Sequence, residues 1–504
     1  MSQTESSPAS APADEVVRRS VRGAATTTLA GLLGRAAGLA TTLLVTHFVH
    51  KSDYGQANLA LIIATVVNAL TLLAPQQALM TRRDHFEESA SLLHGYLLWT
   101  GVVVFSLLAV LGKPLLGQLS EPGALPLLRL YCVALLFERL ALIPSLKLRY
   151  QLRFGDLVQV DLLGDAVYVA VTIGAAVWGS GALCLPLGVL SRQVARVLAL
   201  RFGQKLPVWP PLPGPVSTES RQLLGELWPM MWPIYLASLA ELSTLYMDNL
   251  FVGRVYSTSA QGVYAVGYTI IMTPSETIAM YVASALVRAL GLSDAELRCA
   301  SFLQGLRYVS LALLPIGVGA TLVAPTFEAA LLPERWHGVA QVMIGLSLGA
   351  MSLGIHRMAF ALLTALHRSR LAALAYALQV GCFATGLWLV AATDPDQLHM
   401  ERVAQAVSVA LAVAACGGLA MVLWIDSLRF SQLLVALAPP VAATALMAGM
   451  LLLLRSFTSQ LGLPATVFRL GCEILLGLGS YLLGLRLLFP ALFLDVRNFI
   501  ARRK

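Results

Sequence analysis

The stretch from Ala24 to Phe48 constrains this chain more than any other feature. About 25 apolar or small residues in succession are enough to cross a bilayer as a helix, at ~1.5 Å per residue. One full charge, Arg35, lies near the middle. A cation at mid-bilayer costs at least ~2.5–3.5 kcal/mol on insertion scales, so we expect Arg35 to face a polar interior. The alternative is a structural arginine that pairs with a carboxylate of a neighbouring helix.

Small and hydroxyl residues share one face of this helix with Arg35. At steps of three or four residues, one stripe collects Thr28, Gly31, Arg35, Gly38, Thr42 and Thr46. Such a stripe suits the wall of a wet cavity, and Thr42 is therefore a candidate cavity residue.

The composition excludes an ordinary soluble protein. Of 504 residues, 57% are hydrophobic and only 12% are charged, which predicts an all-α polytopic membrane protein. No basic, aromatic-rich soluble face is present, so nucleic acid is not an expected partner. The six cysteines are scattered without metal-ligand spacing, so we expect no metal and no cofactor.

Apolar segments divide the chain into fourteen expected transmembrane helices. They cover 24–48, 56–80, 92–115, 124–146, 157–178, 182–202, 227–252, 260–287, 301–325, 339–366, 371–392, 401–425, 432–454 and 465–489.

Arginine and lysine alternate in density between successive connections. One side of the membrane receives 20 of the 35 basic residues and the other side receives 6. Because basic connections stay in the cytoplasm, both termini are predicted to be cytoplasmic.

A proline-rich connection predicts how the helices are grouped. Residues 204–226 form a semi-rigid cytoplasmic linker. It separates an N-terminal lobe (24–203, helices 1–6) from a C-terminal lobe (227–425, helices 7–12). A cytoplasmic tail (1–23) precedes the first lobe, and two extra helices with a second tail (426–504) follow the second.

The two lobes resemble each other weakly. SDYGQANLALII, at 52–63, aligns with AQGVYAVGYTII, at 260–271, and Pro75 lies in a place similar to that of Pro274. Since each lobe would start and end in the cytoplasm, these are expected to be parallel repeats related by an axis along the membrane normal.

The motifs GLLGRAAGL, HKSDYGQANLALII, LKLRYQLRFGDLVQVDLLGDAVYVAV, MDNLFVGRVYSTSAQGVYAVGY and LHRSRL resemble bacterial polysaccharide (Wzx-type) flippases. These belong to the multidrug/oligosaccharidyl-lipid/polysaccharide (MOP) exporter superfamily. The resemblance implies two six-helix lobes in a V with alternating access, in the bacterial inner membrane. It implies an undecaprenyl-diphosphate-linked oligosaccharide as substrate and makes polysaccharide polymerase or export machinery a candidate partner.

Arginines inside the membrane are candidate ligands of an anionic diphosphate, because a guanidinium pairs with phosphate oxygens bidentately. Arg139 and Arg357 lie at similar depth in the fourth helix of each lobe, and Arg129 lies nearer the outer face. We expect Arg35, Arg139 and Arg357 to hold the diphosphate together. The alternative for Arg139 is neutralisation by Glu138 or across helices.

Acids and bases on two adjacent helices predict a charge network. Asp161 and Asp165 are four residues apart, as are Arg192 and Arg196. They are most simply an interhelical network with Glu138 nearby, and Arg192 is the member assigned to the cavity.

The C-terminal lobe carries intramembrane acids instead. Glu241 and Asp248 share a face of helix 7, and Glu276 follows Pro274. They are candidates to bind H⁺ or Na⁺, so that an ion gradient or the membrane potential drives transport, or else they hold the arginines.

The leading function is a flippase for lipid-linked oligosaccharide, not an enzyme. A lipid II flippase is the near alternative. A MATE-type drug or cation antiporter conflicts with arginines in the first lobe. A membrane polysaccharide polymerase or ligase would be expected to have a large outer loop, whereas these outer loops span only about 4–15 residues.

Overall fold

The structure is a computed structural model. It describes residues 13–81, 86–118, 122–209, 225, 235, 239, 242–243, 245–290, 294–366, 368–394, 399–425, 428–461, 464–490 and 492.

The chain divides into two compact units, Met1–Leu242 (unit 1) and Ser243–Lys504 (unit 2). Unit 1 contains α1 (Ala13–Phe48), α2 (Lys51–Thr81), α3 (Phe86–Gln118), η2 (Pro122–Ala124), α4 (Leu125–Tyr150), α5 (Phe154–Val177), η3 (Gly181–Leu183), α6 (Cys184–Leu198) and the π-helical η4 (Ala199–Gly203). Unit 2 contains α8 (Thr258–Leu290), α9 (Ala295–Leu331), η5 (Glu334–Trp336), α10 (Val339–Ala365), α11 (Ser369–Thr393), α12 (Glu401–Ile425), α13 (Phe430–Gln460) and α14 (Val467–Leu488). Residues 245–255 are also helical.

The predicted fold class is confirmed. Within the described residues every regular element is helical, and eleven helices are long and apolar enough to cross a membrane. The helix α4 is outside these eleven although it reaches from Leu125 to Tyr150. The expected linker at 204–226 lies mostly outside the described residues, so the predicted domain boundaries stay a prediction.

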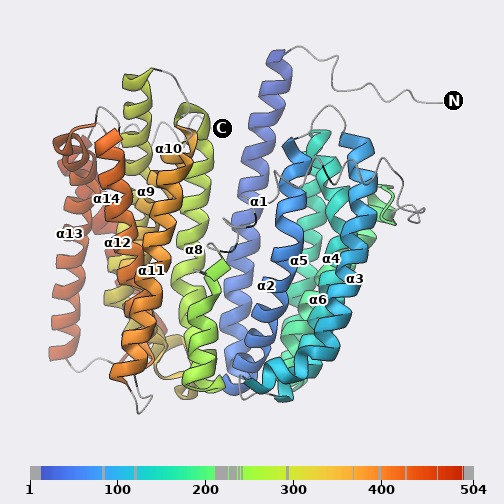
Figure 1. Cartoon of the computed structure of the whole chain (residues 1–504). Helices are drawn as coiled ribbons and strands as arrows, with labels where there is room; N and C mark the ends of the chain where they lie inside the picture. The colour runs from blue at the N-terminus through green and yellow to red at the C-terminus, as the bar shows by residue number, and fades with distance from the viewer. Residues whose placement is uncertain are drawn as a thin grey trace. The chain divides into compact units, whose positions relative to one another are not determined.

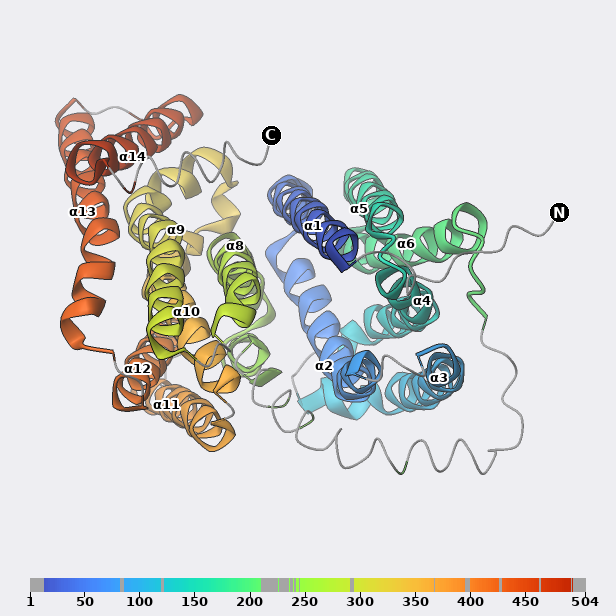
Figure 2. The ribbon, with the colours of Figure 1, turned by 90° about the horizontal axis from the view of Figure 1, so that it is seen from above.

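In unit 1, α5 and α6 pack against each other, and α1 packs against α5 while α4 packs against α6 (Figures 1 and 2). The helices α2 and α3 complete the unit by packing against α4 and against each other. A core of apolar side chains from α4, α5, α6 and η4, among them Leu148, Leu157 and Leu200, fills one end of this arrangement. The polar side chains of α4, α5 and α6 are thereby brought together in one unit.

In unit 2, α10 is the central helix and packs against α8, α9 and α12 (Figure 2). Glycines let α12 approach α10 closely. A Cβ on Gly345 would lie 2.7 Å from the Cβ of Ala404, and a Cβ on Gly349 would lie 2.9 Å from the Ser408 hydroxyl. The Ser408 hydroxyl accepts from the Gly349 N–H (2.9 Å) and donates to the Gly345 carbonyl (2.6 Å). Small residues four apart on both helices are typical of tight helix pairs in membranes.

The two last helices pack on α9 (Figure 2). The Tyr481 hydroxyl donates to the Leu311 carbonyl (2.7 Å), and the Thr326 hydroxyl donates to Glu473 (3.0 Å). Arg469 pairs with Glu473, four residues further along α14, at 3.0 Å. Because Glu473 is buried, Arg469 and Thr326 compensate its charge inside the packed helices.

Candidate functional site

Arg35 lies in α1 with an exposed side chain. Within the described residues it makes no ion pair and no side-chain hydrogen bond, so the predicted alternative of a clamped structural arginine has no partner there. Its neighbour Gly34 packs directly on Asp165 of α5, since a Cβ on Gly34 would overlap that carboxylate. A glycine therefore brings α1 against α5 next to the charged face of α5.

Two ion pairs join α5 to α6. The Arg192 Nη2 lies 2.6 Å from Asp165 Oδ1, and the Arg196 Nη2 lies 3.0 Å from Asp161 Oδ1. Arg196 also donates to Gln193 (3.1 Å). The Arg192 side chain is 42% exposed, whereas those of Asp165 and Arg196 are 17% and 19% exposed. Of the four side chains in these pairs, that of Arg192 is the most exposed, so Arg192 is the member most accessible to a ligand.

Arg139 occupies a fully enclosed position in α4, with 0% of its surface exposed. Its Nε and Nη2 donate to the Asn68 side-chain oxygen (3.2 and 3.1 Å), and Nη1 donates to the Leu97 carbonyl (2.8 Å). Further donors meet the hydroxyls of Thr100 and Thr71, and the guanidinium carbon lies 5.1 Å from the centre of the Phe105 ring. An Arg139 held in this way must leave Asn68 before it can meet a diphosphate, and its role as a ligand stays a prediction.

Glu138 continues this network toward α6. The Asn68 side-chain nitrogen donates to Glu138 (3.2 Å), so one amide contacts both members of the Glu138–Arg139 sequence. The Glu138 carboxylate also interacts electrostatically with Arg196 and Arg192. The charges of α4, α5 and α6 therefore form one connected set, which holds three carboxylates and three arginines. Arg35 adds one positive charge beside this set.

The remaining predicted cavity residues of unit 1 lie apart from these charges or are covered. Arg129 is exposed, and its Nε donates to the Ala109 carbonyl of α3 (3.2 Å). Thr42 is buried and lies in hydrogen-bonding contact with the Tyr54 hydroxyl. The stripe on α1 is thus exposed at Arg35 but covered at Thr42.

Asp248 of unit 2 is fully buried and accepts several hydrogen bonds. The Tyr264 hydroxyl donates to Oδ2 (2.8 Å), and the Asn249 backbone and side-chain nitrogens donate to Oδ1 (2.7 and 3.1 Å). Asn249 in turn accepts from the Gln261 side chain (3.3 Å). Within the described residues no ion pair to Asp248 is formed, so hydrogen bonds alone compensate its charge.

Glu276 of α8 accepts a similar hydrogen bond, from a tyrosine one helical turn after Tyr264. The Tyr268 hydroxyl donates to Glu276 at 2.8 Å, and the Tyr264 and Tyr268 rings lie 6.5 Å apart. A tyrosine thus stands before each of the two acids, Asp248 and Glu276. The third predicted acid, Glu241, lies outside the described residues.

Arg357 lies half-buried in α10 next to His356. The His356 ring is buried and packs edge-on against Tyr376 of α11, with ring centres 5.8 Å apart. Arg357 belongs to unit 2, whereas Arg35 and Arg139 belong to unit 1. The expected joint site of these three arginines therefore stays a prediction.

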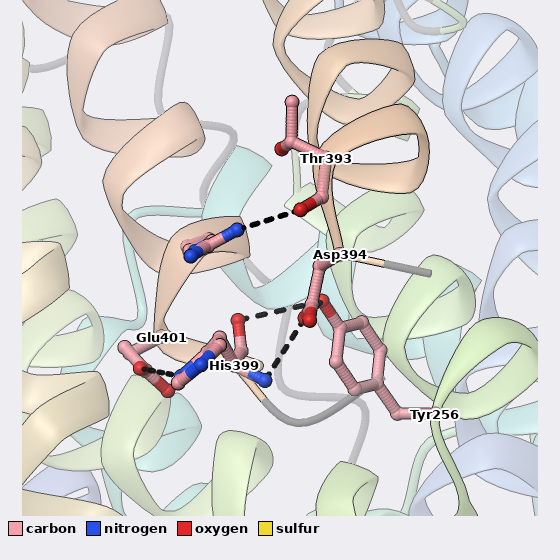
Figure 3. Close-up of polar contacts among 6 residues, drawn as sticks. Tyr256, Thr393, Asp394, His399 and Glu401 are labelled. Atoms are coloured by element: carbon pink, nitrogen blue, oxygen red, sulfur yellow. Dashed lines mark hydrogen bonds and ion pairs between the residues drawn. The ribbon is translucent and has the colours of Figure 1, made fainter. Parts of the chain in front are cut away.

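A second polar cluster closes one end of unit 2 (Figure 3). The buried Asp394, which follows α11, accepts from the Tyr256 hydroxyl (2.8 Å) and from the His399 backbone N–H (2.9 Å). The His399 ring contacts Glu401 (3.0 Å), and Arg402 donates to the Thr393 carbonyl (3.0 Å). Burial and the bond to Asp394 raise the pKa of Tyr256, which keeps its hydroxyl a neutral donor. These hydrogen bonds connect the segment between α11 and α12 to Tyr256, and we interpret the cluster as structural.

A family model described as "polysaccharide biosynthesis protein" matches residues 44–341, which is more than half of the chain. The chain belongs to this polysaccharide biosynthesis family. A search of curated proteins finds no match.

Solved structures share the fold of this family member. The lipid II flippase MurJ, in an inward closed conformation, superposes with a TM-score of 0.71 at 13% identity, covering 92% of this chain and 98% of MurJ. An inward-facing multidrug-resistance MATE transporter of the MOP superfamily gives 0.57 at 15% identity, covering 77% and 93%. A MOP superfamily transporter from Pyrococcus furiosus gives 0.53 at 15% identity, covering 80% and 94%. These likenesses confirm the predicted MOP-type fold.

Sequence reasoning missed several residues of the network in this polysaccharide biosynthesis protein. Asn68, Thr71 and Thr100 hold Arg139, and Tyr264 and Tyr268 hold Asp248 and Glu276. The tyrosines had a signal, because both lie in the quoted motif at positions four apart. Asn68 had a weaker one, as an amide in an otherwise apolar stretch of α2.

Proposed function

We propose that this chain is a flippase that moves a polyprenyl-diphosphate-linked oligosaccharide across the bacterial inner membrane by alternating access. One observation carries the proposal: Arg35 lies in a membrane-spanning helix with its side chain exposed and unpaired within the described residues. A permanent cation there is costly against lipid, so the side chain belongs in a polar compartment. Arg192, whose side chain is 42% exposed, lies in α6, and both α1, which carries Arg35, and α6 pack against α5.

The substrate class follows from charge and from the family. The exposed Arg35 and the partly exposed Arg192 are suited to phosphate oxygens, which arginines bind through planar, bidentate donors. Arg139, which is already bonded to Asn68, would instead fix the positions of α2 and α4 around this surface. Membership of a polysaccharide biosynthesis family supports a lipid-linked sugar as the cargo of such a surface.

Lipid II is the second candidate substrate, because the fold similarity to MurJ extends over 92% of the chain. Both candidates carry a diphosphate between a lipid and a sugar, so the arginines do not separate them. A cationic drug would meet Arg35 and Arg192 with like charge, which disfavours the MATE-type alternative.

The test is translocation by purified protein in liposomes. Three fluorescent cargoes are compared: a polyprenyl-diphosphate oligosaccharide, lipid II and a cationic dye. We expect the oligosaccharide to be moved, and Arg35→Gln to lower its rate about tenfold or more, since a charge-assisted bond contributes ~1.5–3 kcal/mol. Arg35→Lys should retain part of the rate.

The control is Arg455→Gln, which removes an exposed arginine near the end of α13. Movement of the dye alone would contradict the proposal. A normal rate for Arg35→Gln at matched protein content would remove Arg35 from the site.

Asp248 and Glu276 are proposed to couple transport to H⁺ or Na⁺. Their support is the burial of Asp248 and the tyrosine hydroxyl that donates to each acid, since Glu276 itself is half-buried. In the liposome assay Asp248→Asn should abolish the dependence of the rate on an imposed H⁺ or Na⁺ gradient. A gradient response equal to that of the wild type would exclude Asp248 as the coupling group.

The proposed topology places both termini in the cytoplasm, on the evidence of the distribution of basic residues. Cysteines introduced at Ser52 and Thr393 should react with an impermeant reagent in intact cells. A cysteine at Ser217 should react only after permeabilisation. Reaction at Ser217 in intact cells would reverse the orientation.

A further inference from the structure

An open groove of about 490 Å³ runs between α5 and the end of α6. Its walls are almost entirely apolar and include Leu163 and Val167 of α5, Leu198 of α6 and Phe202 of η4. Gln159 and Gln204 are its polar members. The side chains of Leu163, Leu198 and Phe202 are exposed there. The groove has the volume of a ligand site, since such sites enclose ~300–1,000 Å³.

This groove is separate from the charged surface described above. A step of two residues along a helix turns about 200°, so Leu163 lies on the face of α5 opposite Asp161 and Asp165. Those two acids pair with α6 on the other side of the helix pair. On α5 the groove wall therefore faces away from the two acids that contact Arg192 and Arg196.

The π-helical turn η4 shapes one end of the groove. Residues Ala199–Gly203 continue α6 with a wider turn, and Gln204 then donates its backbone N–H to the Ala199 carbonyl (3.0 Å). Such turns are rare and are found frequently at functional sites. Here the turn presents Phe202 at the wall and directs the following residues across the groove end.

Cations surround this end. Arg153 donates to Gln204 (2.8 Å) and pairs with Asp156 (2.7 Å), so its charge is already compensated. Arg201, within η4, and Lys205, directly after the groove residue Gln204, are both exposed. Within the part of the chain that the structure describes, neither one has an ion pair or a side-chain hydrogen bond. The groove is thus apolar along its length, and two exposed cations are sequence neighbours of the residues that line its η4 end.

We propose that this groove binds an anionic phospholipid, with an acyl chain along α5 and α6 and the phosphate at Arg201 and Lys205. The depth of the groove supports a hydrocarbon chain as its occupant. Gln159 and Val167 lie about 8 and 20 Å along α5 from its first residue, at ~1.5 Å per residue. The two residues are thus about 12 Å apart along the helix axis, which is most of the hydrocarbon depth of one leaflet, ~15 Å.

The cations select the headgroup. Basic residues at a membrane surface favour anionic lipids over zwitterionic ones. Because Arg201 lies within η4 and Lys205 follows it closely, a bound lipid would hold the π-helical turn in place. The proposed lipid is accordingly a structural ligand of unit 1 and is distinct from the transported substrate.

The test is native mass spectrometry of the full chain, purified and then exposed to phosphatidylglycerol or phosphatidylcholine with matched chains. The wild type should retain phosphatidylglycerol preferentially. Arg201→Gln/Lys205→Gln should lower this retention at least about fivefold, since both cations proposed to contact the lipid phosphate are lost. Leu198→Trp, which fills the groove, should lower the retention of both lipids. Glycerol phosphate, which has no acyl chain, should not compete.

Two matched controls separate this site from general surface effects. Arg368→Gln/Arg370→Gln removes two exposed cations of unit 2, and Leu183→Trp enlarges an exposed leucine in η3. Both should bind lipid as the wild type does. Unchanged retention in Arg201→Gln/Lys205→Gln, equal losses in the control pair, or displacement by glycerol phosphate would each overturn the proposal.

Discussion

The side-chain oxygen of Asn68 accepts two hydrogen bonds from Arg139, and the nitrogen of the same amide donates to Glu138. Asn68→Leu removes these bonds and leaves a buried cation and a half-buried acid without this partner. Breaking a buried charged network by removing one partner costs about 3–5 kcal/mol. We therefore expect a large drop in melting temperature and in membrane abundance, measured by fluorescence-detected size exclusion. Thr385→Val, an exposed change in α11, should leave both unchanged; equal effects would contradict the role of Asn68.

The ion pair of Arg192 with Asp165 predicts a non-additive pair of substitutions. Asp165→Asn and Arg192→Gln should each lower thermal stability, and the double variant should lose less than the sum. The coupling should be about 1 kcal/mol or below, because Arg192 is more than a third exposed. Additive losses in the thermal melts would show that the pair contributes nothing to stability.

The contact of Gly349 with Ser408 predicts that a single methyl group is too large there. Gly349→Ala brings a Cβ to 2.9 Å from the Ser408 hydroxyl, so overpacking should cost about 1–3 kcal/mol. Gly381→Ala is the matched control, because nothing lies within 4 Å of its added Cβ. Both changes gain helix propensity. The thermal stability should fall only for Gly349→Ala, and a gain there would refute the tight α10–α12 contact.

The bond from Tyr256 to Asp394 predicts a loss of stability in Tyr256→Phe. Asp394 keeps the His399 N–H but loses one donor, at a cost of about 1–2 kcal/mol. The folded state raises the pKa of Tyr256, so the unfolded chain ionises first, from its ordinary value of about 10 upward. The advantage of wild type over Tyr256→Phe should therefore be full at pH 7 and shrink above pH ~10. An advantage that grows with alkalinity would contradict this assignment.

The fold class could be predicted from the sequence because hydrophobic length is a local property. The partners of intramembrane charges depend on helices far apart in the chain. The ion pairs between α5 and α6 could be predicted, because two acids four residues apart and two arginines four residues apart lie on adjacent helices. They are Asp161, Asp165, Arg192 and Arg196.

The contacts of Arg139 and Asp394 were not foreseeable in the same way. Asn68 is 71 residues from Arg139, and Tyr256 is 138 residues from Asp394. No short-range spacing relates such residues, so only the packed helices reveal that they meet. The same holds for Thr42, whose place on the stripe of α1 did not predict its burial against Tyr54.

The glycine face of α10 also has a consequence for how the protein is made. Gly349 receives its hydrogen bond from Ser408, which is synthesised 59 residues later. At ~5–20 residues per second, the ribosome needs about 3–12 s to produce that partner. During this interval α8, α9 and α10 have been made but α12 has not. The glycine face of α10 therefore lacks the helix that packs against it. The close contact between α10 and α12 can therefore form only after Ser408 has been made, so this packing step is fixed by the order of synthesis.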